Sequence, residues 1–391
     1  YWGGPCVDFV LWSSFLIPRG WKAPLALHLP MGVAGDIFTH PEALLYIDGQ
    51  PIASADRYHH TIELHPALAD RKRHDIALHG WTGLSGWPPD PADKSKLFMR
   101  ECSVVELDET LETFLSKAEV ALGVAKYLDD IRPEKHRILN ALDDAFLALD
   151  TRDPIGKDLH ASAPAALAIL EAGLAQAGPP MDVTLAGIGH AHMDIAYLWP
   201  VDQIRLKNTR TYSNVLRLMD KHPEFHFSHS QPQLYQFVEQ DTPEMFERIK
   251  SRVAEGRWEV MGGSWVEMDA NIPSGESLVR QLMLGRRYYR DKFGDAETPV
   301  LWLPDTFGFP GTLPQLMKLA GMQWFMTNKM SWNQYNPMPS STTWWEGIDG
   351  TRVLAHFLTT PREVQHLPFP TNYKSDLTAP EVFGPWEVST E

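Results

Sequence analysis

The 391-residue chain is long enough for two or three domains, and its 43% hydrophobic and 22% charged residues are typical of globular proteins. A net charge of −15 argues against nucleic acid or an anionic membrane surface as a partner, and no apolar run reaches the ~18 residues of a transmembrane helix. Cys6 and Cys102 are far apart and no signal peptide is recognisable, so we expect a reducing, cytoplasmic compartment.

Residues 1–95 are rich in Pro and Gly and contain short apolar runs that are typical of strands. The predicted strands are 25–29, 43–47, 60–64 and 75–79. Asp48-Gly49, which lies between two apolar segments, predicts a tight hairpin. Several short strands joined by such turns favour an ancillary β-sandwich domain at the amino terminus.

Residues 96–178 change to the helical period of apolar side chains. The predicted helices are 107–115, 138–147 and 164–177, with Pro164 in the first turn of the last one. The many carboxylates of this region are typical of a solvated helix face. We therefore expect a helical connector packed on the domain that follows.

From residue 179 to residue 391, predicted strands alternate with predicted helices, the pattern of a parallel α/β fold. The strands are 183–188, 225–229, 258–261, 299–303, 323–326 and 352–356, and the helices are 205–221, 243–254, 277–292 and 313–320. No phosphate-binding loop or dinucleotide fingerprint is present. We expect this region to be a partial, distorted parallel β/α barrel.

Histidine and aspartate follow the first predicted strand of this region, in Gly189-His190-Ala191-His192-Met193-Asp194. Because side chains alternate along an extended chain, His192 and Asp194 point to one side, and His190 shares it. An imidazole and a carboxylate at this spacing suit a divalent metal such as zinc, and α/β folds gather ligands at the carboxyl ends of strands. A surface turn is the alternative interpretation.

A carboxylate also follows the predicted strand 299–303, in Pro304-Asp305-Thr306-Phe307-Gly308. Pro and Gly interrupt the chain there before the helix at 313–320 begins. Asp305 is therefore either a loop residue near a helix start or a third metal ligand that is also a nucleophile. His229 and His356 lie at other predicted strand ends, where we expect structural hydrogen bonds rather than metal ligation.

Together these segments resemble the amino-terminal portion of glycoside hydrolase family 38, the class II α-mannosidases, in the bacterial and fungal cytosolic-type branch. The resembling text covers 189–200, 256–289, 301–336 and 342–357. The resemblance implies a retaining α-mannosidase that hydrolyses terminal α-mannosides of mannose-containing oligosaccharides with one zinc, or another divalent metal, per site.

The same resemblance implies a role for individual residues. His192, Asp194 and Asp305 match zinc ligands, and Asp305 also matches the nucleophile. Tyr197, Phe307 and Asp269 match positions beside the sugar, the last in a strand-end segment, Trp265–Asp269. The general acid/base is not fixed by a motif: Glu363 and Asp349 are the candidates, and Asp349-Gly350 also has the pattern of a turn.

Two family features have no match here: a fourth zinc ligand, a histidine far downstream, and a glycine-rich loop. We therefore expect a truncated part of a larger enzyme, with little activity by itself and a tendency to associate, and a homo-oligomer is compatible with this. Two other functions stay open: a metal-dependent carbohydrate deacetylase, and a non-catalytic or incomplete carbohydrate-binding fragment.

Overall fold

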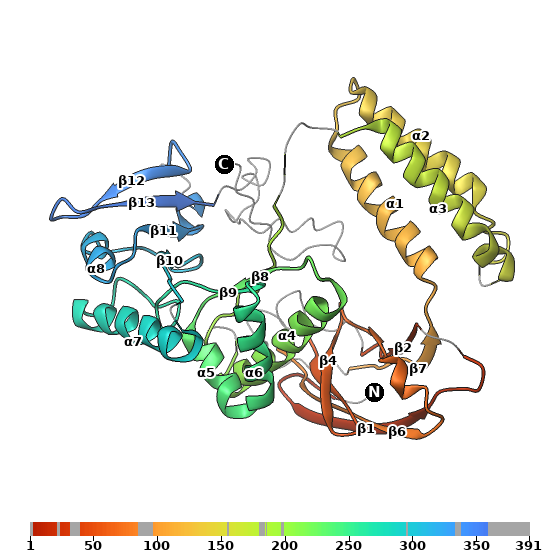
Figure 1. The fold of residues 1–391 in the computed structure, drawn as a ribbon, viewed down its shortest axis with the longest axis horizontal. Helices are drawn as coiled ribbons and strands as arrows, with labels where there is room; N and C mark the ends of the chain where they lie inside the picture. Colours follow the sequence, from red (N-terminus) through yellow and green to blue (C-terminus); the bar gives the residue numbers. More distant parts are fainter. Residues whose placement is uncertain are drawn as a thin grey trace.

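A computed structural model describes residues 3–21, 24–31, 40–84, 97–154, 156–179, 184, 186–196, 199–294, 296–332 and 338–358. The fold is a mixture of helices and strands (Figure 1). Figure 1 shows a group of sheets at the amino terminus, three long helices beside it, and a region of alternating helices and short strands. No helix in these ranges is long and apolar enough to cross a membrane.

Two antiparallel sheets form the amino-terminal region. One has the order β1-β6-β3-β4, with β1 (Asp8–Leu16), β6 (Arg73–Trp81), β3 (Glu42–Ile47) and β4 (Gln50–Asp56). The other has the order β5-β2-β7, with β5 (Thr61–Glu63), β2 (Leu25–His28) and β7 (Ser103–Glu106), and the short 3₁₀ helix Pro66–Leu68 follows β5. Both sheets contribute to one apolar core, as Leu27 of β2 and Leu45 of β3 illustrate. The strand β7 lies inside the segment for which we expected helical structure.

The four predicted strands of this region and the hairpin at Asp48-Gly49 are confirmed. Asp48 has φ +49° and Gly49 has φ +81°, so both central residues of the turn have a left-handed backbone. This is the type I′ geometry, whose twist matches that of the flanking strands β3 and β4. The sequence analysis missed β1, β4 and β7; in β1 the apolar residues form runs rather than a regular alternation.

Three helices follow: α1 (Glu109–Tyr127), α2 (Pro133–Ala148) and α3 (Lys157–Ala177). They pack on one another around a core of their own, lined largely by alanine and leucine. The prediction that α3 begins at Pro164 is wrong, because the helix begins at Lys157 and Pro164 is inside it. The alanine-rich sequence around this proline, and the packing of α3 on α2, outweigh the loss of one backbone hydrogen bond.

The remaining elements alternate between helix and strand. They are α4 (Val201–Lys221), β8 (Phe227–His229), α5 (Pro232–Asp241), α6 (Pro243–Ala254), β9 (Trp258–Val260), α7 (Gly275–Phe293), β10 (Val300–Trp302), α8 (Leu313–Leu319), β11 (Trp324–Thr327), the 3₁₀ helix Lys329–Trp332, β12 (Thr342–Glu346) and β13 (Arg352–Phe357). The strands β8 and β9 pair in parallel, and β10, β11 and β13 pair in parallel with β12 antiparallel at the edge. In the ranges described, these are two separate sheets; barrel closure stays a prediction.

The strand predicted at 183–188 is not formed by those of its residues that the structure describes. Instead Gly189, the next residue, makes a parallel bridge to Phe227 of β8. Its backbone N–H donates to the carbonyl of His226 (2.9 Å), and its carbonyl accepts from the N–H of Ser228 (2.9 Å). The histidine-containing loop that begins at His190 therefore leaves from the edge of the β8–β9 sheet.

One face of α4 is attached to the amino-terminal sheets by polar side chains. Positions 203, 207, 210, 214, 217 and 221, spaced by three or four residues, share that face. Their partners in the sheets are Asp8, Glu42, Ser54 and Glu63. The opposite face of α4 is apolar and packs into the same core as Met193 of the histidine-containing loop. The helix thus joins the amino-terminal region to the site.

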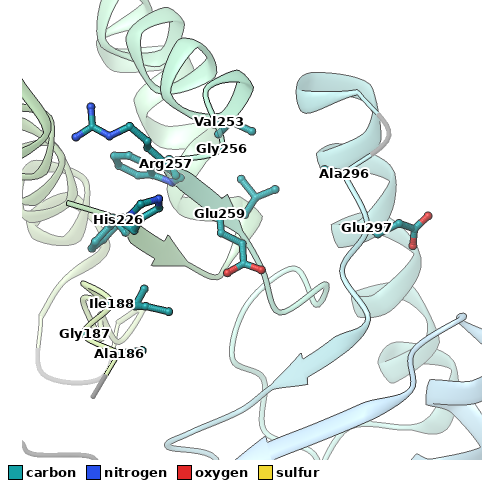
Figure 2. A pocket seen from close by; sticks show the side chains of 13 residues that line it. Ala186, Gly187, Ile188, His226, Val253, Gly256, Arg257, Glu259, Ala296 and Glu297 are labelled. Carbon is teal, nitrogen blue, oxygen red and sulfur yellow. The ribbon is translucent and has the colours of Figure 1, made fainter. Parts of the chain in front are cut away.

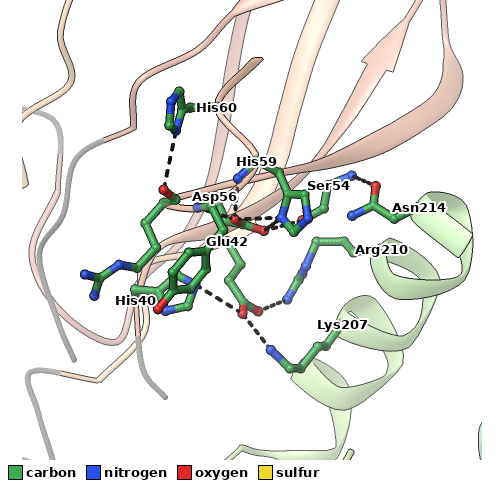
Figure 3. A network of polar contacts seen from close by, with 11 residues as sticks. His40, Glu42, Ser54, Asp56, His59, His60, Lys207, Arg210 and Asn214 are labelled. Carbon is green, nitrogen blue, oxygen red and sulfur yellow. Dashed lines mark hydrogen bonds and ion pairs between the residues drawn. The ribbon is translucent and has the colours of Figure 1, made fainter. Parts of the chain in front are cut away.

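Glu42 of β3 is the centre of this contact (Figure 3). Its carboxylate accepts from Lys207 Nζ (2.6 Å) and Arg210 (2.6 Å), and His40 Nε2 lies 3.7 Å away. Burial alone raises the pKa of Glu42, but Lys207 and Arg210 outweigh burial and lower it from 4.5 to about 2. The carboxylate is therefore charged, and paired, at any pH near neutrality.

Replacing Glu42 with glutamine is expected to lower the free energy of unfolding by about 3–5 kcal/mol, because the buried Arg210 and the half-buried Lys207 lose their counter-ion. Since the folded pKa of Glu42 lies below its unfolded value, its contribution is complete above pH 4.5 and is lost as the pH falls toward 2. Urea unfolding at pH 7 and pH 3 measures this: the difference between wild type and Glu42→Gln should shrink at pH 3. Glu63→Gln, which breaks the more exposed pair of this β5 residue with Lys221 of α4, should cost under about 1 kcal/mol.

Candidate metal-binding active site

The side chains of His192, Asp194 and Asp305 converge, although more than one hundred residues separate the last two. One ligand atom from each lies within 4.8 Å of the others. His192 Nε2 is 3.2 Å from Asp194 Oδ1 and 3.7 Å from Asp305 Oδ2. All three are half-buried, so they are partly shielded from water yet reachable from it. Asp305 follows β10, in the loop that leaves the carboxyl end of the strand.

Buried hydrogen bonds hold the backbone of the histidine-containing loop. The carbonyl of Ala191 accepts from His229 Nε2 (2.7 Å), so Nδ1 of His229 accepts from the Tyr212 hydroxyl (2.8 Å). Burial lowers the pKa of His229 well below its ordinary value, in agreement with a neutral ring. Both ring nitrogens are engaged, so the expected structural role of His229 is confirmed. His356 contacts Thr342 across the β12–β13 pair (2.9 Å) and is not part of the cluster.

His190 lies next to the cluster but is bonded to other residues. Its Nδ1 donates to the carbonyl of Ser228 (2.8 Å), and its ring packs against that of Trp302, with centroids 5.2 Å apart. Burial lowers the pKa of His190 to about 4, so the ring is neutral at pH 7. These contacts fit a residue that supports the loop, and His190 is not in the group of converging ligand atoms.

Two charged residues that the sequence analysis did not single out lie beside the cluster. Glu267 Oε1 is 3.4 Å from His192 Nδ1, and the Lys329 ammonium pairs with Asp305 Oδ1. Burial lowers the pKa of His192, but Glu267 and the two aspartates outweigh this and hold it well above its ordinary value. Burial raises the pKa of Asp305, but His192 and Lys329 outweigh it and keep the pKa low, so the carboxylate is ionised at neutral pH.

Lys329 could have been found by the reasoning that identified Asp305. It follows β11, the parallel neighbour of β10, at the same end of the sheet. Its ammonium also lies 4.6 Å from the centre of the Phe307 ring. Because Lys329 occupies one side of Asp305, the carboxylate presents Oδ2 toward His192. Glu267 gives no such signal, since it lies in an irregular segment.

The residues expected beside the substrate have different environments. Phe307 is 59% exposed, next to Lys329. Asp269 is exposed and outside the cluster: its Oδ1 accepts from the N–H groups of Asn271 and Ile272 (both 2.8 Å). Asn271 in turn donates to the carbonyl of Phe307 (3.1 Å), so the Asp269 turn supports the Phe307 loop.

The remaining site predictions concern Tyr197, expected beside the sugar, and the two acid/base candidates Glu363 and Asp349. Tyr197 and Glu363 lie outside the described residues. Asp349 forms the turn between β12 and β13, where its two oxygens accept from the backbone N–H (3.1 Å) and hydroxyl (2.7 Å) of Thr351. Asp349 therefore has the turn role that its sequence pattern indicates.

A separate pocket lies at the amino-terminal ends of β8 and β9 (Figure 2). Its lining includes Ile188, His226, Arg257 and Glu259. The guanidinium of Arg257 is already occupied by backbone carbonyls, including that of His222 (2.7 Å). Because the cluster of His192, Asp194 and Asp305 lies beyond the opposite ends of the strands, this pocket is not part of the candidate site.

The donor set fits a divalent metal. Imidazole nitrogen and carboxylate oxygen are ligands that zinc accepts, and three protein ligands with further positions open are typical of catalytic zinc sites. In the part of the chain that the structure describes, this is the one group of three or more potential ligands that converges in this way. The expected meeting of His192, Asp194 and Asp305 is thus found in the structure, while metal binding itself is a proposal.

Comparison with known proteins identifies the family. Residues 182–387, more than half of the chain, match the model of the glycosyl hydrolases family 38 N-terminal domain. Alpha-mannosidase 2C1 of Homo sapiens is 34% identical over 328 residues, which cover 81% of this chain and 31% of that protein. Alpha-mannosidase G of Dictyostelium discoideum is 45% identical over 170 residues, which cover 44% of this chain and 16% of that protein.

Among solved structures, an alpha-mannosidase from Enterococcus faecalis V583 is similar, with 27% sequence identity and a TM-score of 0.40 over 44% of this chain and 19% of that one. The chain spans about a third of the length of the human relative. The family match includes both segments that carry the converging ligands, Gly189–Asp194 and the Asp305 loop. The chain therefore belongs to glycosyl hydrolase family 38.

Proposed function

We propose that this chain carries the metal-dependent catalytic site of a retaining α-mannosidase. The observation that supports it most directly is the convergence of His192, Asp194 and Asp305 within 4.8 Å, in a chain whose relatives are named alpha-mannosidases. The proposed substrates are terminal α-mannosides of mannose-containing oligosaccharides. Family membership favours this glycosidase over the deacetylase alternative.

In the proposed reaction, Asp305 attacks the anomeric carbon while the bond to the leaving oxygen breaks. The leaving oxygen takes a proton from a carboxylic acid, for which Glu363 remains the proposed candidate. Water then hydrolyses the mannosyl ester on Asp305, with the same acid acting as base, and the product keeps the α configuration. Asp305 suits the role of nucleophile because Lys329 and His192 keep it ionised.

Zinc, held by His192, Asp194 and Asp305, would orient the sugar hydroxyls and help to distort the ring toward the oxocarbenium-like transition state. Lys329 fixes the carboxylate of Asp305 at one oxygen, which limits its rotation. The exposed ring of Phe307, and Tyr197, are the proposed apolar contacts of the sugar. Asp269 is proposed to act through the turn that supports Phe307.

The proposed arrangement of the chain remains a β-sandwich at 1–95, a helical connector at 96–178 and a distorted parallel β/α barrel at 179–391. Two contacts support a connection between the first and last of these: Gln203 of α4 donates to Asp8 (2.7 Å), and Lys207 pairs with Glu42. The cytoplasmic location and association of the chain with itself stay predictions.

Hydrolysis of an aryl α-mannoside tests the function. Because the relatives are about three times longer, the assay uses a chimera in which this chain replaces the matching segment of human alpha-mannosidase 2C1, beside the chain alone. We expect the chimera to release mannose that NMR detects first as the α anomer, and to need zinc or cobalt. Initial release of the β anomer, or a chimera that stays inactive while its relative is active, would contradict the proposal.

A further inference from the structure

The carboxylate of Glu267 lies buried beneath His192. Its side chain is 9% exposed, and Oε1 is 3.4 Å from His192 Nδ1. In the part of the chain described by the structure, neither of its oxygens has a hydrogen-bond partner. A buried carboxylate without such a partner is costly, so its placement calls for a group that can donate to it.

His192 can supply that donor only through one of its two nitrogens. Nε2 faces Asp194 Oδ1 (3.2 Å) and Asp305 Oδ2 (3.7 Å), while Nδ1 faces Glu267. A metal among the three ligands needs the lone pair of Nε2, so the ring proton must be on Nδ1. Metal-binding histidines commonly donate this proton to a carboxylate, which fixes the tautomer and the ring orientation.

We propose that Glu267 is the positioning residue of the metal site: it accepts the Nδ1 proton of His192 and so directs Nε2 at the metal. The proposal rests on the metal site of the proposed function. Glu267 acts through His192 and is not itself a ligand, since it is outside the converging group.

Gln231 links the loop that carries His192 to the segment that carries Glu267, and so supports the contact between these two side chains. Its Nε2 donates to the carbonyl of Met193 (2.7 Å), next to His192, and its Oε1 accepts from the N–H of Glu267 (3.1 Å). The residue is buried and has φ +66°, a left-handed backbone that glutamine rarely adopts. This strained conformation places one amide group between the histidine loop and Glu267.

Three proteins of nearly equal side-chain volume at position 267 test the proposal: wild type, Glu267→Gln and Glu267→Met. Gln keeps an acceptor oxygen without the charge, and Met removes the acceptor. Zinc affinity, measured by competition with a chelator, should fall about 10- to 100-fold in Glu267→Met, with Glu267→Gln in between. Glu259→Gln, at an exposed position on β9, is the matched control and should bind zinc like wild type.

A spectroscopic signature separates positioning from a merely structural effect. In zinc-loaded wild type, the Nδ1–H proton of His192 should appear far downfield in NMR spectra and exchange slowly, and His192→Ala assigns it by its loss. The signal should move upfield and broaden in Glu267→Met. If that variant does not fold, the same comparison is made with Glu267→Gln.

Two results are distinguishable. If His192→Ala weakens zinc binding but both Glu267 variants match wild type in affinity and in the Nδ1–H signal, the positioning role is wrong and the metal site stands. If His192→Ala leaves zinc affinity unchanged, the metal site of the proposed function is wrong, and the role of Glu267 is overturned with it.

Discussion

Replacing Asp305 with alanine is expected to lower kcat for an aryl α-mannoside by at least about 10³-fold, equivalent to about 4 kcal/mol of transition-state stabilisation. The change removes the proposed nucleophile, which is also one of the three converging side chains. It also leaves the buried Lys329 without its carboxylate partner, so Asp305→Asn, which keeps the side-chain shape, is measured in parallel.

The measurements use the chimera with the human relative described above. Circular dichroism and the unfolding midpoint establish that each variant is folded before its rate is compared. Asp291→Ala removes an exposed carboxylate of α7 and should keep the wild-type rate. In wild type, a slow mannosyl inactivator should label Asp305. Labelling of another carboxylate, or an Asp305→Ala variant that keeps a tenth of the wild-type rate, would rule out the nucleophile assignment.

His192→Ala and Asp194→Ala are each expected to weaken zinc binding by more than about 100-fold, because each removes a proposed ligand, and loss of a supporting residue alone costs about 10- to 100-fold. Elemental analysis after gel filtration and chelator competition measure this on the 391-residue chain. His190→Ala should have a smaller effect, since its Nδ1 is bonded to the Ser228 carbonyl and the residue is outside the converging group.

His226→Ala is the matched control for this series. His226 is exposed at the opposite end of β8, and its Nδ1 contacts the carbonyl of Glu224 (2.9 Å). Its removal should leave the zinc content unchanged. Full zinc occupancy in both His192→Ala and Asp194→Ala would contradict the metal site.

Local sequence determined most elements of the chain. The 3.6-residue apolar period identified α1, α2, α4, α6 and α7, because a helix must bury one face whatever it packs against. The Asp48-Gly49 pair identified its hairpin, because these two residues tolerate the left-handed backbone that the turn requires. The sequence analysis missed β12 and α5, although α5 has a proline in its first turn and apolar residues at helical spacing.

The sequence predicted that the three side chains converge, because the ends of the strands that precede them could be recognised. His192, Asp194 and Asp305 were each identified because a polar residue follows a buried strand, and the carboxyl ends of parallel strands share an edge. The strand expected before His192 is not formed in the described residues. The single bridge from Gly189 to Phe227 nevertheless places the loop at the edge of the β8–β9 sheet. The three side chains therefore converge as expected.

Only the tertiary structure decided which charged residues surround that cluster. In the segment Trp265–Asp269 the sequence pointed to Asp269, but the irregular backbone turns Asp269 to solvent and buries Glu267 beneath His192. Likewise, nothing local to Glu42 indicates that it meets Lys207 and Arg210, 165 and 168 residues away. The sequence by itself predicted the helices and the candidate ligands, because an apolar helical period and a polar residue after a strand are both local patterns. The partners of each buried charge were decided by long-range packing, because such a charge takes its counter-ion from whichever element is folded against it.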